Sequence, residues 1–551
     1  MKNAIISIGD CILCLLVAFE FTSASKYISC GQCKYDLEFL LTLIVTFAVF
    51  VLAIYGFKGA LNNVGKKIFI NDNRFSWFSK ILENRYGIVL IAGIMFLVWL
   101  PVLIFLYPGT LINDTWGEIN QFIDFTTGNG NLFDHHPIFD TLVMGSIIVP
   151  VAKLTNNWQV AFFVYVIMQA IITCIVFSYT LHYVYNKLKI GSVCAFILFS
   201  VYCFLPIFPV SSQTVSKDAL FSWMYVLFIV QYFELVRTDG EVLKQHSFII
   251  KLIVLAILCC LSKKVGAYVI LLSLFFALLF LRKCRRKLLI AICCTFAFMF
   301  IFMPFIKSQL NVVAGGKQEM FSLPFQMSAR YVVEHGDDIT PEEYEILDAV
   351  LGMEDLAQRY DPTNADPVKG YDQRAVAMYY IKYIGVWVKQ GLRHPTSYWH
   401  ATNAMISCWF SWEEFIPLMN MDWHGQLNPN NVPESATVRT GIAATTASAY
   451  ESFYHNLYNN SFLRTLFTYG FYASLMPLFC VSLILQTLKK DIKYWIVLVP
   501  MLLSILLGCW LAPVSICIEG RRYLYPIIYT LPITLTMCIV GYENSRQNLK
   551  V

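Results

Sequence analysis

Apolar runs long enough to cross a bilayer recur along nearly the whole chain. A hydrocarbon core of about 30 Å needs roughly 20 apolar residues in a helix. Backbone groups in lipid must find hydrogen bonds within their own segment, so these runs are helical. We therefore expect an all-α polytopic membrane protein with about 12 transmembrane helices, within a range of about 11–13. The runs fall at 4–22, 37–57, 87–107, 158–185, 191–206, 219–236, 248–262, 267–281, 288–306, 466–487, 494–512 and 523–540.

Charged residues between the runs predict the orientation. Loop 58–86 carries six Lys or Arg residues, whereas loop 108–137 has none and carries four acids. The positive-inside rule places the first loop in the cytoplasm and the second outside. Both termini are then cytoplasmic. Later basic clusters, at 187–189, 237, 282–287 and 489–493, also fall inside, provided that the apolar stretch 138–154 does not cross.

The stretch 138–154 is short and begins directly after His-His-Pro. We interpret it as a helix lying in the interface, so that interfacial helices form the first outer loop. The segment 307–465 is too long for a bare connector and predicts a small extracytoplasmic subdomain. We expect four units: a two-helix extension with its cytoplasmic loop over 1–86, a transmembrane core over 87–306 with the first outer loop at 108–157, the subdomain over 307–465, and C-terminal transmembrane helices over 466–551.

Composition agrees with a membrane protein. The 551 residues are 57% hydrophobic and 14% charged, and soluble domains carry about 25% charged residues. A net charge of +5 needs no nucleic acid to explain it. The 17 cysteines lie mostly in apolar segments, where Cys behaves as a small hydrophobe. Cys30 and Cys33 form one CxxC, which lacks the second pair of a zinc site, and we interpret it as structural or incidental.

The first outer loop holds the leading candidate for catalysis. Tyr107-Pro108-Gly109 ends a span, and Asp114 follows at the membrane surface. A carboxylate there could act as general base on a sugar or lipid hydroxyl, and partial burial would tune its pKa. The alternative is that Asp114 only caps an interfacial helix.

Other polar residues of this loop are candidates for support of the acceptor. Glu118 lies one helical turn after Asp114, and Asp134-His135-His136-Pro137 closes the loop. Histidines can bind a metal or donate protons. Adjacent histidines on a helix do not face one another, so the pair is a weak metal signal. A structural histidine pair at the water interface is the alternative.

Several basic residues lie at the ends of spans that we expect on the outer face, where the positive-inside rule disfavours them. Lys217-Asp218 opens one span, Lys263-Lys264 ends another, and Arg521-Arg522-Tyr523 opens the last. Cations on this face suggest that an anionic group is bound there. Arginine binds phosphate in bidentate fashion. Snorkelling to lipid headgroups is the alternative.

These motifs together resemble the GT-C superfamily of glycosyltransferases, especially an uncharacterised bacterial branch with a YPG…D…HHP first outer loop. The matching segments share their order and sidedness and span most of residues 87–540. The resemblance places the catalytic base at Asp114 and the end of the first loop at His136-Pro137. It assigns the donor phosphate to the cations and their neighbours, namely Lys217, Asp218, Lys263, Lys264, Arg521, Arg522 and Tyr523.

The resemblance implies inverting transfer of a sugar from a polyprenyl-phosphate donor to a cell-envelope glycan or lipid, on the extracytoplasmic face of a bacterial plasma membrane. It implies no certain cofactor, because some members use a divalent metal and others do not. The paired acids of protein mannosyltransferases are absent, since Thr115 follows Asp114, and Trp409-Phe410-Ser411-Trp412 differs from the oligosaccharyltransferase motif. A peptide acceptor is therefore disfavoured.

Two rival functions remain open. A polysaccharide polymerase or ligase using a lipid-diphosphate donor shares the basic outer face. A transporter or flippase of lipid-linked sugars should carry ionisable residues deep within several spans. Here the unexpected charges lie at the outer ends of the spans, which favours chemistry at the membrane surface.

Overall fold

The computed structural model describes residues 6–30, 32–369, 372–416, 418, 431–433, 436, 438–488, 491–511 and 520–546. Within these ranges, nine helices are long and apolar enough to cross a membrane, and four shorter helices are also apolar. Strands in the described part are limited to two parallel pairs of two residues each. The prediction of an all-α polytopic membrane protein is confirmed.

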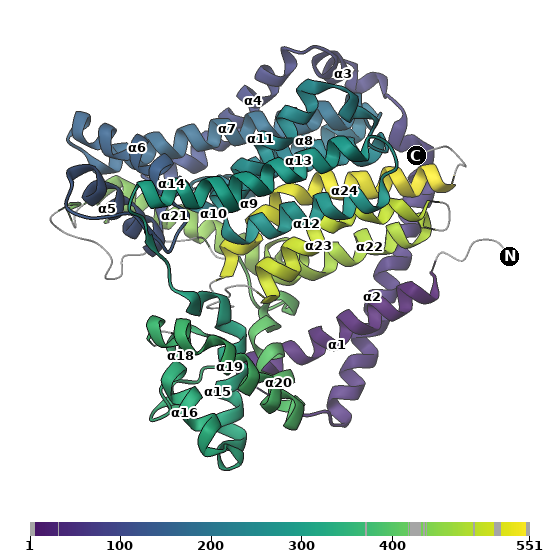
Figure 1. Ribbon diagram of the computed structural model, residues 1–551. Coiled ribbons are helices and arrows are strands. Elements are labelled where there is room, and N and C mark those ends of the chain that lie inside the picture. The colour runs from purple at the N-terminus through teal and green to yellow at the C-terminus, as the bar shows by residue number, and fades with distance from the viewer. Residues whose placement is uncertain are drawn as a thin grey trace.

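Ten helices form a bundle around one continuous hydrophobic core (Figure 1). The central member is α10 (Lys217–Arg237), since 83% of the residues in its most apolar part are buried. A helix that is apolar all round belongs in the interior. The other nine are α4 (Gly87–Phe105), α7 (Trp158–Asn186), α8 (Ser192–Phe204), α11 (His246–Ser262), α12 (Lys264–Phe280), α13 (Arg285–Ala297), α22 (Met476–Thr487), α23 (Val499–Ile505) and α24 (Tyr525–Arg546).

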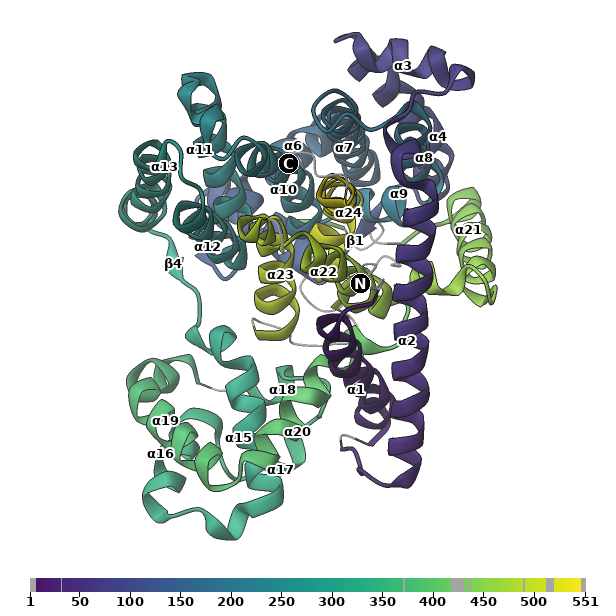
Figure 2. The same cartoon turned by 90° about the vertical axis from the view of Figure 1, so that its right-hand side faces the viewer.

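Helices α1 (Ile8–Cys30) and α2 (Leu37–Val64) form a hairpin along the outside of this bundle (Figure 2). Lys58 Nζ lies 2.9 Å from Asp10 Oδ2, and neither side chain is exposed. The prediction that Lys58 belongs to the cytoplasmic loop is wrong, because α2 continues to Val64 and Asp10 holds the cation inside the protein. Ser482 of α22 also donates to Asp10, which attaches the hairpin to the bundle.

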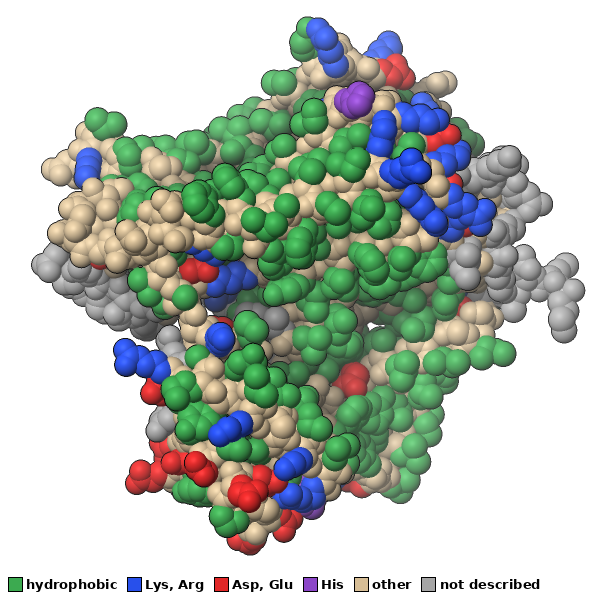
Figure 3. Space-filling view, in the orientation of Figure 1, with side chains coloured by type: hydrophobic (Ala, Val, Ile, Leu, Met, Phe, Trp, Pro, Cys, Tyr) green, Lys and Arg blue, Asp and Glu red, His purple; other side chains and the backbone are tan. Residues whose placement is uncertain are grey.

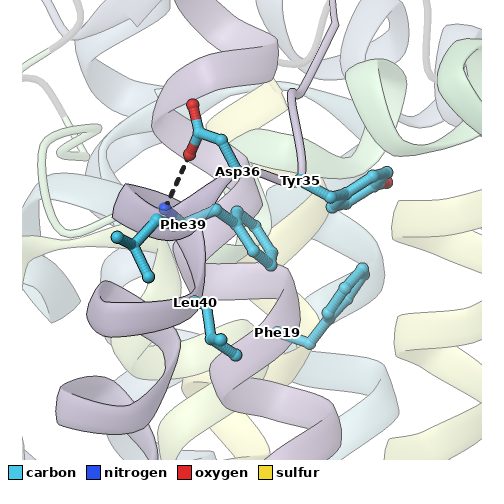
Figure 4. A pocket seen from close by; sticks show the side chains of 6 residues that line it. Phe19, Tyr35, Asp36, Phe39 and Leu40 are labelled. Carbon is cyan, nitrogen blue, oxygen red and sulfur yellow. Dashed lines mark hydrogen bonds between the residues drawn. The ribbon is translucent and has the colours of Figure 1, made fainter.

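The turn of the hairpin lines a shallow cavity of about 580 Å³ (Figure 4). Aromatic side chains dominate it, and Asp36 accepts a hydrogen bond from the Phe39 amide to cap α2. Its lining contains none of the charged residues singled out above. Cys33, nearby, is a free buried thiol; the side chain of Cys30 lies outside the described part. The cavity is lined by Phe19, Tyr35, Asp36, Leu37, Phe39 and Leu40.

Basic loops meet at one end of the bundle. Asp239 accepts hydrogen bonds from the Arg282 amide (3.2 Å) and from Lys493 Nζ (3.5 Å). The Gly191 amide donates to Ile68 O over 2.7 Å, which joins the loops around 58–86 and 187–192. Figure 3 shows Lys and Arg gathered at this end, with hydrophobic side chains covering the face beside it. The opposite end holds α5 (Asn113–Thr127), α14 (Met303–Gln309) and α21 (Gly441–Asn459) (Figure 1).

Helix α6 (Ile138–Thr155) is long and apolar enough to span a membrane, yet it stays at this opposite end (Figure 1). Asn186, at the end of α7, donates to Leu82 O just before α4 begins (2.8 Å). The chain thus leaves the basic end in α4 and returns to it in α7. Helix α6 therefore begins and ends on the same side, which supports the interpretation of 138–154 as an interfacial helix.

The segment 307–465 contains a compact helical subdomain and a separate arm. Five of the six helices of the subdomain contribute to a core of their own that includes Phe325, Leu347 and Tyr383, and the sixth, α20, packs against α15 (Figures 1 and 2). Helix α21 does not join them and packs near the end of α4 instead. The six helices are α15 (Ser322–His335), α16 (Pro341–Leu351), α17 (Leu356–Arg359), α18 (Asp366–Lys369), α19 (Gln373–Arg393) and α20 (Pro395–Ile406).

Candidate functional site

A short strand pair places two outer loops in register. β1 (Thr110–Leu111) pairs in parallel with β3 (Thr214–Val215), and α5 and α10 begin directly afterwards. The pair forms where Gly109 has φ +113°, and a Cβ there would come within 2.5 Å of Val166 Cγ2. Only glycine fits such a position. The Pro-Gly turn thus brings the start of α5 beside the start of α10.

Asp114 is the centre of a charged cluster built from four parts of the chain. Its Oδ2 lies 2.8 Å from Lys217 Nζ and 2.5 Å from Arg522 Nη1. His136 Nε2 is 3.9 Å from Asp114 Oδ1, and its Nδ1 is 2.6 Å from Lys217 Nζ. The structure therefore brings the predicted base, one predicted histidine and two predicted cations together. They lie at the end of the bundle opposite the basic loops.

Asp218 extends the cluster toward a third cation. Lys263 Nζ lies 2.6 Å from Asp218 Oδ1, and Arg522 Nε lies 3.8 Å from Asp218 Oδ2. Arg522 thus bridges Asp114 and Asp218. The ring centroid of Tyr523 lies 5.6 Å from Lys263 Nζ, so this predicted residue also belongs to the site.

Two buried carboxyl groups lie behind Asp114. Glu118 is one helical turn further along α5, is 1% exposed, and accepts a hydrogen bond from Thr141 Oγ1 (3.2 Å). Asp140, in the first turn of α6, is fully buried. Glu118 Oε1 and both carboxyl oxygens of Asp140 have no hydrogen-bond partner among the described residues. A buried carboxylate without partners is costly, so both groups favour the protonated form.

The environment separates the pKa values of Asp114 and Glu118. Burial alone would raise the pKa of Asp114, but the cations of Lys217 and Arg522 outweigh it and hold that pKa well below its ordinary value. Burial raises the pKa of Glu118 to about 8, although Lys217 opposes this. Burial and the Lys217 cation hold the pKa of His136 well below its ordinary value, so this imidazole is neutral. Neighbouring groups with separated pKa values are a feature of catalytic sites.

The charge balance of the cluster is positive. At neutral pH, Lys217, Lys263 and Arg522 face two ionised carboxylates, Asp114 and Asp218. One positive charge is in excess, which favours binding of an anion. The three cations each keep part of the side chain exposed, at 16%, 12% and 23% respectively.

A second ion-pair cluster lies beside the first. β2 (Phe133–Asp134) pairs in parallel with β4 (Val313–Ala314). Asp134 Oδ2 lies 2.7 Å from Lys307 Nζ and 3.8 Å from Lys264 Nζ. Lys264, predicted to bind the donor phosphate with Lys263, is therefore paired with Asp134. The exposed His135 stacks on Phe133 and contacts the ring of His136, so it lies at the edge of the site.

Sequence reasoning missed Asp140 and Lys307. Both carried a usable signal: Asp140 is an acid entering an apolar helix, and Lys307 is another cation at an outer helix end. The side chain of Arg521, predicted to bind phosphate, lies outside the described part. Among the described residues, one group of His, Cys, Asp or Glu is close enough to share a metal ion, and it lies in the subdomain rather than here.

The raised pKa of Glu118 predicts how stability depends on pH. The folded protein keeps a proton up to about pH 8 that the unfolded chain releases near 4.5. The free energy of unfolding therefore falls as pH rises through this window. Glu118→Gln removes the titrating proton, so we expect a flatter pH dependence in thermal unfolding of the detergent-purified protein. The exposed Glu342→Gln is the control and should keep the wild-type slope; an unchanged slope in Glu118→Gln would contradict this assignment.

Comparison with known proteins gives a family but no function. Residues 126–550 match the model of a family of unknown function, DUF6020. No curated protein and no solved structure matches the chain. The matched range begins after Asp114 and includes His136, Lys217, Asp218, Lys263 and Arg522.

Proposed function

The chain belongs to the DUF6020 family, and we propose that it is a membrane glycosyltransferase of the GT-C type that uses a polyprenyl-phosphate sugar donor. One observation carries the proposal: Asp114 lies in direct contact with Lys217 and Arg522, and Lys263 is joined to them through Asp218. A carboxylate beside clustered cations at one end of a membrane bundle suits transfer from a lipid-linked phosphate.

Two features support an extracytoplasmic site. The Lys- and Arg-rich loops meet at the other end of the bundle, where the positive-inside rule expects the cytoplasm. Cys408, in the segment that contains the subdomain, is disulfide-bonded. Disulfides persist mainly outside the cytosol. Both features support our proposal that the Asp114 cluster lies on the outer side of a plasma membrane.

The donor phosphate binds Lys217, Lys263 and Arg522 in this mechanism. Without donor, Lys217 and Arg522 are held by Asp114. A bound phosphate attracts both cations and weakens their contact with the carboxylate. The pKa of Asp114 then rises, because the charges that hold it down have another partner. Donor binding thus converts a strongly paired carboxylate into an effective general base.

The transfer step is a direct displacement at the anomeric carbon. The acceptor hydroxyl oxygen bonds to that carbon while its proton passes to an Asp114 oxygen. The bond between the anomeric carbon and the phosphate oxygen breaks, and the polyprenyl phosphate leaves with the electron pair. Lys217, Lys263 and Arg522 stabilise the charge that develops on this leaving group. Protonated Glu118 lies behind the base and can donate a hydrogen bond toward the acceptor.

Adjacent lysines offer a matched test of this assignment. Lys263 belongs to the Asp218 part of the site, whereas Lys264 pairs with Asp134. We expect Lys263→Gln to raise KM for a polyprenyl-monophosphate sugar by about 10- to 100-fold, since a charged hydrogen bond contributes roughly 1.5–3 kcal/mol. Lys264→Gln should change KM less than about threefold. Transfer of labelled sugar by purified protein is the measurement, with gel filtration as a check on folding.

The same assay separates the rival readings. A polymerase or ligase would accept a diphosphate-linked donor and not a monophosphate-linked one. A flippase would move the donor from one leaflet of a vesicle bilayer to the other without consuming it. The deep pair of Asp10 and Lys58 gives a flippase little support, because both side chains are sealed from solvent at the peripheral hairpin. Equal KM effects in the two lysine variants would remove the phosphate-binding assignment.

A further inference from the structure

A second constellation of ionisable residues lies in the helical subdomain. His335 ends α15, Asp338 ends the short 3₁₀ helix η6 (Gly336–Asp338), and His394 joins α19 to α20. One ligand atom from each residue lies within 4.8 Å of the other two. We propose that His335, Asp338 and His394 bind one zinc ion. This site is independent of the proposed sugar transfer.

The two imidazoles are already arranged face to face. Their ring centroids are 3.7 Å apart and the rings are inclined by 9°. His394 Nε2 lies 2.8 Å from Asp338 Oδ2. Ligand atoms around a tetrahedral zinc ion lie about 3.3 Å apart for bonds of about 2.0–2.1 Å. The three ligand atoms are therefore close to the separation that one ion requires, and zinc binding would tilt the two stacked rings so that their nitrogen lone pairs converge on it.

Surrounding groups hold the ligands in place. Arg393 Nη1 donates to the Asp338 carbonyl oxygen over 2.8 Å, and Arg393 Nη2 lies 2.9 Å from Glu343 Oε1. The Tyr331 ring centroid is 5.6 Å from the centroids of both histidine rings. Glu343 is itself fixed by a capping box with Thr340 at the start of α16. Such outer contacts orient metal ligands and reduce the cost of binding.

The donor set favours zinc over Mg²⁺ and Ca²⁺. Two imidazole nitrogens and one carboxylate oxygen are a usual zinc set, whereas Mg²⁺ and Ca²⁺ prefer oxygen alone. Asp338 is 51% exposed in its side chain, so water can fill the fourth position. The ion would join the end of α15 to the corner between α19 and α20. Helix α20 in turn contacts the hairpin, where His400 Nδ1 lies 3.0 Å from the Tyr27 hydroxyl.

Zinc binding can be measured on the full-length protein, purified in detergent through an affinity tag without histidine and stripped with EDTA. We expect about one zinc ion per chain after dialysis against ZnCl₂, with a higher unfolding temperature in the metal-bound protein. His335→Gln and His394→Gln should each weaken zinc binding at least about 100-fold, more than loss of an outer-shell group does.

His455→Gln is the matched control, because His455 also lies near a carboxylate, with Nε2 4.0 Å from Glu451 Oε1. It should bind zinc as the wild type does. Stoichiometric binding that survives both substitutions, or no binding by the wild type, overturns the proposal and leaves a surface ion pair between His394 and Asp338. Cobalt-loaded wild-type protein provides a readout that needs no variant: visible bands of a four-coordinate ion support the site, and the spectrum of aqueous cobalt contradicts it.

Discussion

We expect Asp114→Asn to lower the kcat of the proposed sugar transfer by about 10²–10⁴, the range that a positioned general base contributes. Asparagine has nearly the same shape but cannot accept the acceptor proton. The substitution also leaves Lys217 and Arg522 without the carboxylate that holds them at 2.8 and 2.5 Å. We therefore expect the donor to bind at least as tightly as in the wild type, because its phosphate no longer competes with Asp114. Initial rates and donor KM from the transfer assay test both statements.

The control for this substitution lies in the same helix. Asp124 is also an α5 acid, but it accepts a hydrogen bond from Asn431 (3.0 Å) and takes no part in the Asp114 cluster. Asp124→Asn should retain most of the wild-type kcat. Full activity in Asp114→Asn would remove this residue from the mechanism. A parallel rise in donor KM and fall in kcat would instead indicate that Asp114 mainly positions the cations.

Lys58→Met destabilises the protein strongly. Removing one partner of a buried ion pair leaves the other charge uncompensated, at a cost of about 3–5 kcal/mol. The side chains of Asp10 and Lys58 are both fully buried. We expect a clearly lower unfolding temperature of the purified protein in detergent. The effect should appear although Lys58 is remote from the Asp114 cluster.

The double variant Asp10→Asn with Lys58→Met separates charge from packing. It removes both charges, so most of the stability lost in Lys58→Met should return. Arg74→Met, at the exposed pair with Asp72, is the control and should change stability little, since surface ion pairs contribute about 0–1 kcal/mol. A double variant as unstable as Lys58→Met would show that side-chain packing, not charge pairing, is the dominant contribution.

Much of the architecture was predictable because its signals are local. Each predicted apolar range coincides with helix in the described part, since hydrophobicity over about 20 residues decides whether a segment can lie in lipid. The distribution of Lys and Arg between the apolar ranges predicted that 138–154 does not cross the membrane. In the structure, α6 begins and ends at the same end of the bundle. The grouping of Asp114, Lys217, Lys263 and Arg522 was also expected. The positive-inside rule disfavours cations on the outer face, so several cations there suggest one shared anionic ligand.

Other features depend on contacts between distant segments and carry no local signal. The pairing of β1 with β3 involves two residues on each side, too few for any strand pattern. Lys263 and Lys264 are neighbours in sequence, yet their side chains join different clusters. From the sequence, Lys58 was predicted to be a cation of the cytoplasmic loop, because its partner, Asp10, lies 48 residues earlier in the chain. Asp140 has a local signal, as an acid entering an apolar helix, but its position as a second buried carboxyl near Glu118 depends on the packing of α6 against α5.

Arg522 reaches Asp114 from 408 residues further along the chain. A ribosome therefore makes the 408 residues that follow Asp114 before the cluster has its guanidinium. Any product that stops before Arg522 carries Asp114, Asp218 and the two lysines without the side chain that bridges the two acids. We expect such a fragment to lack the proposed transfer activity, so that this activity would report that synthesis has passed Arg522.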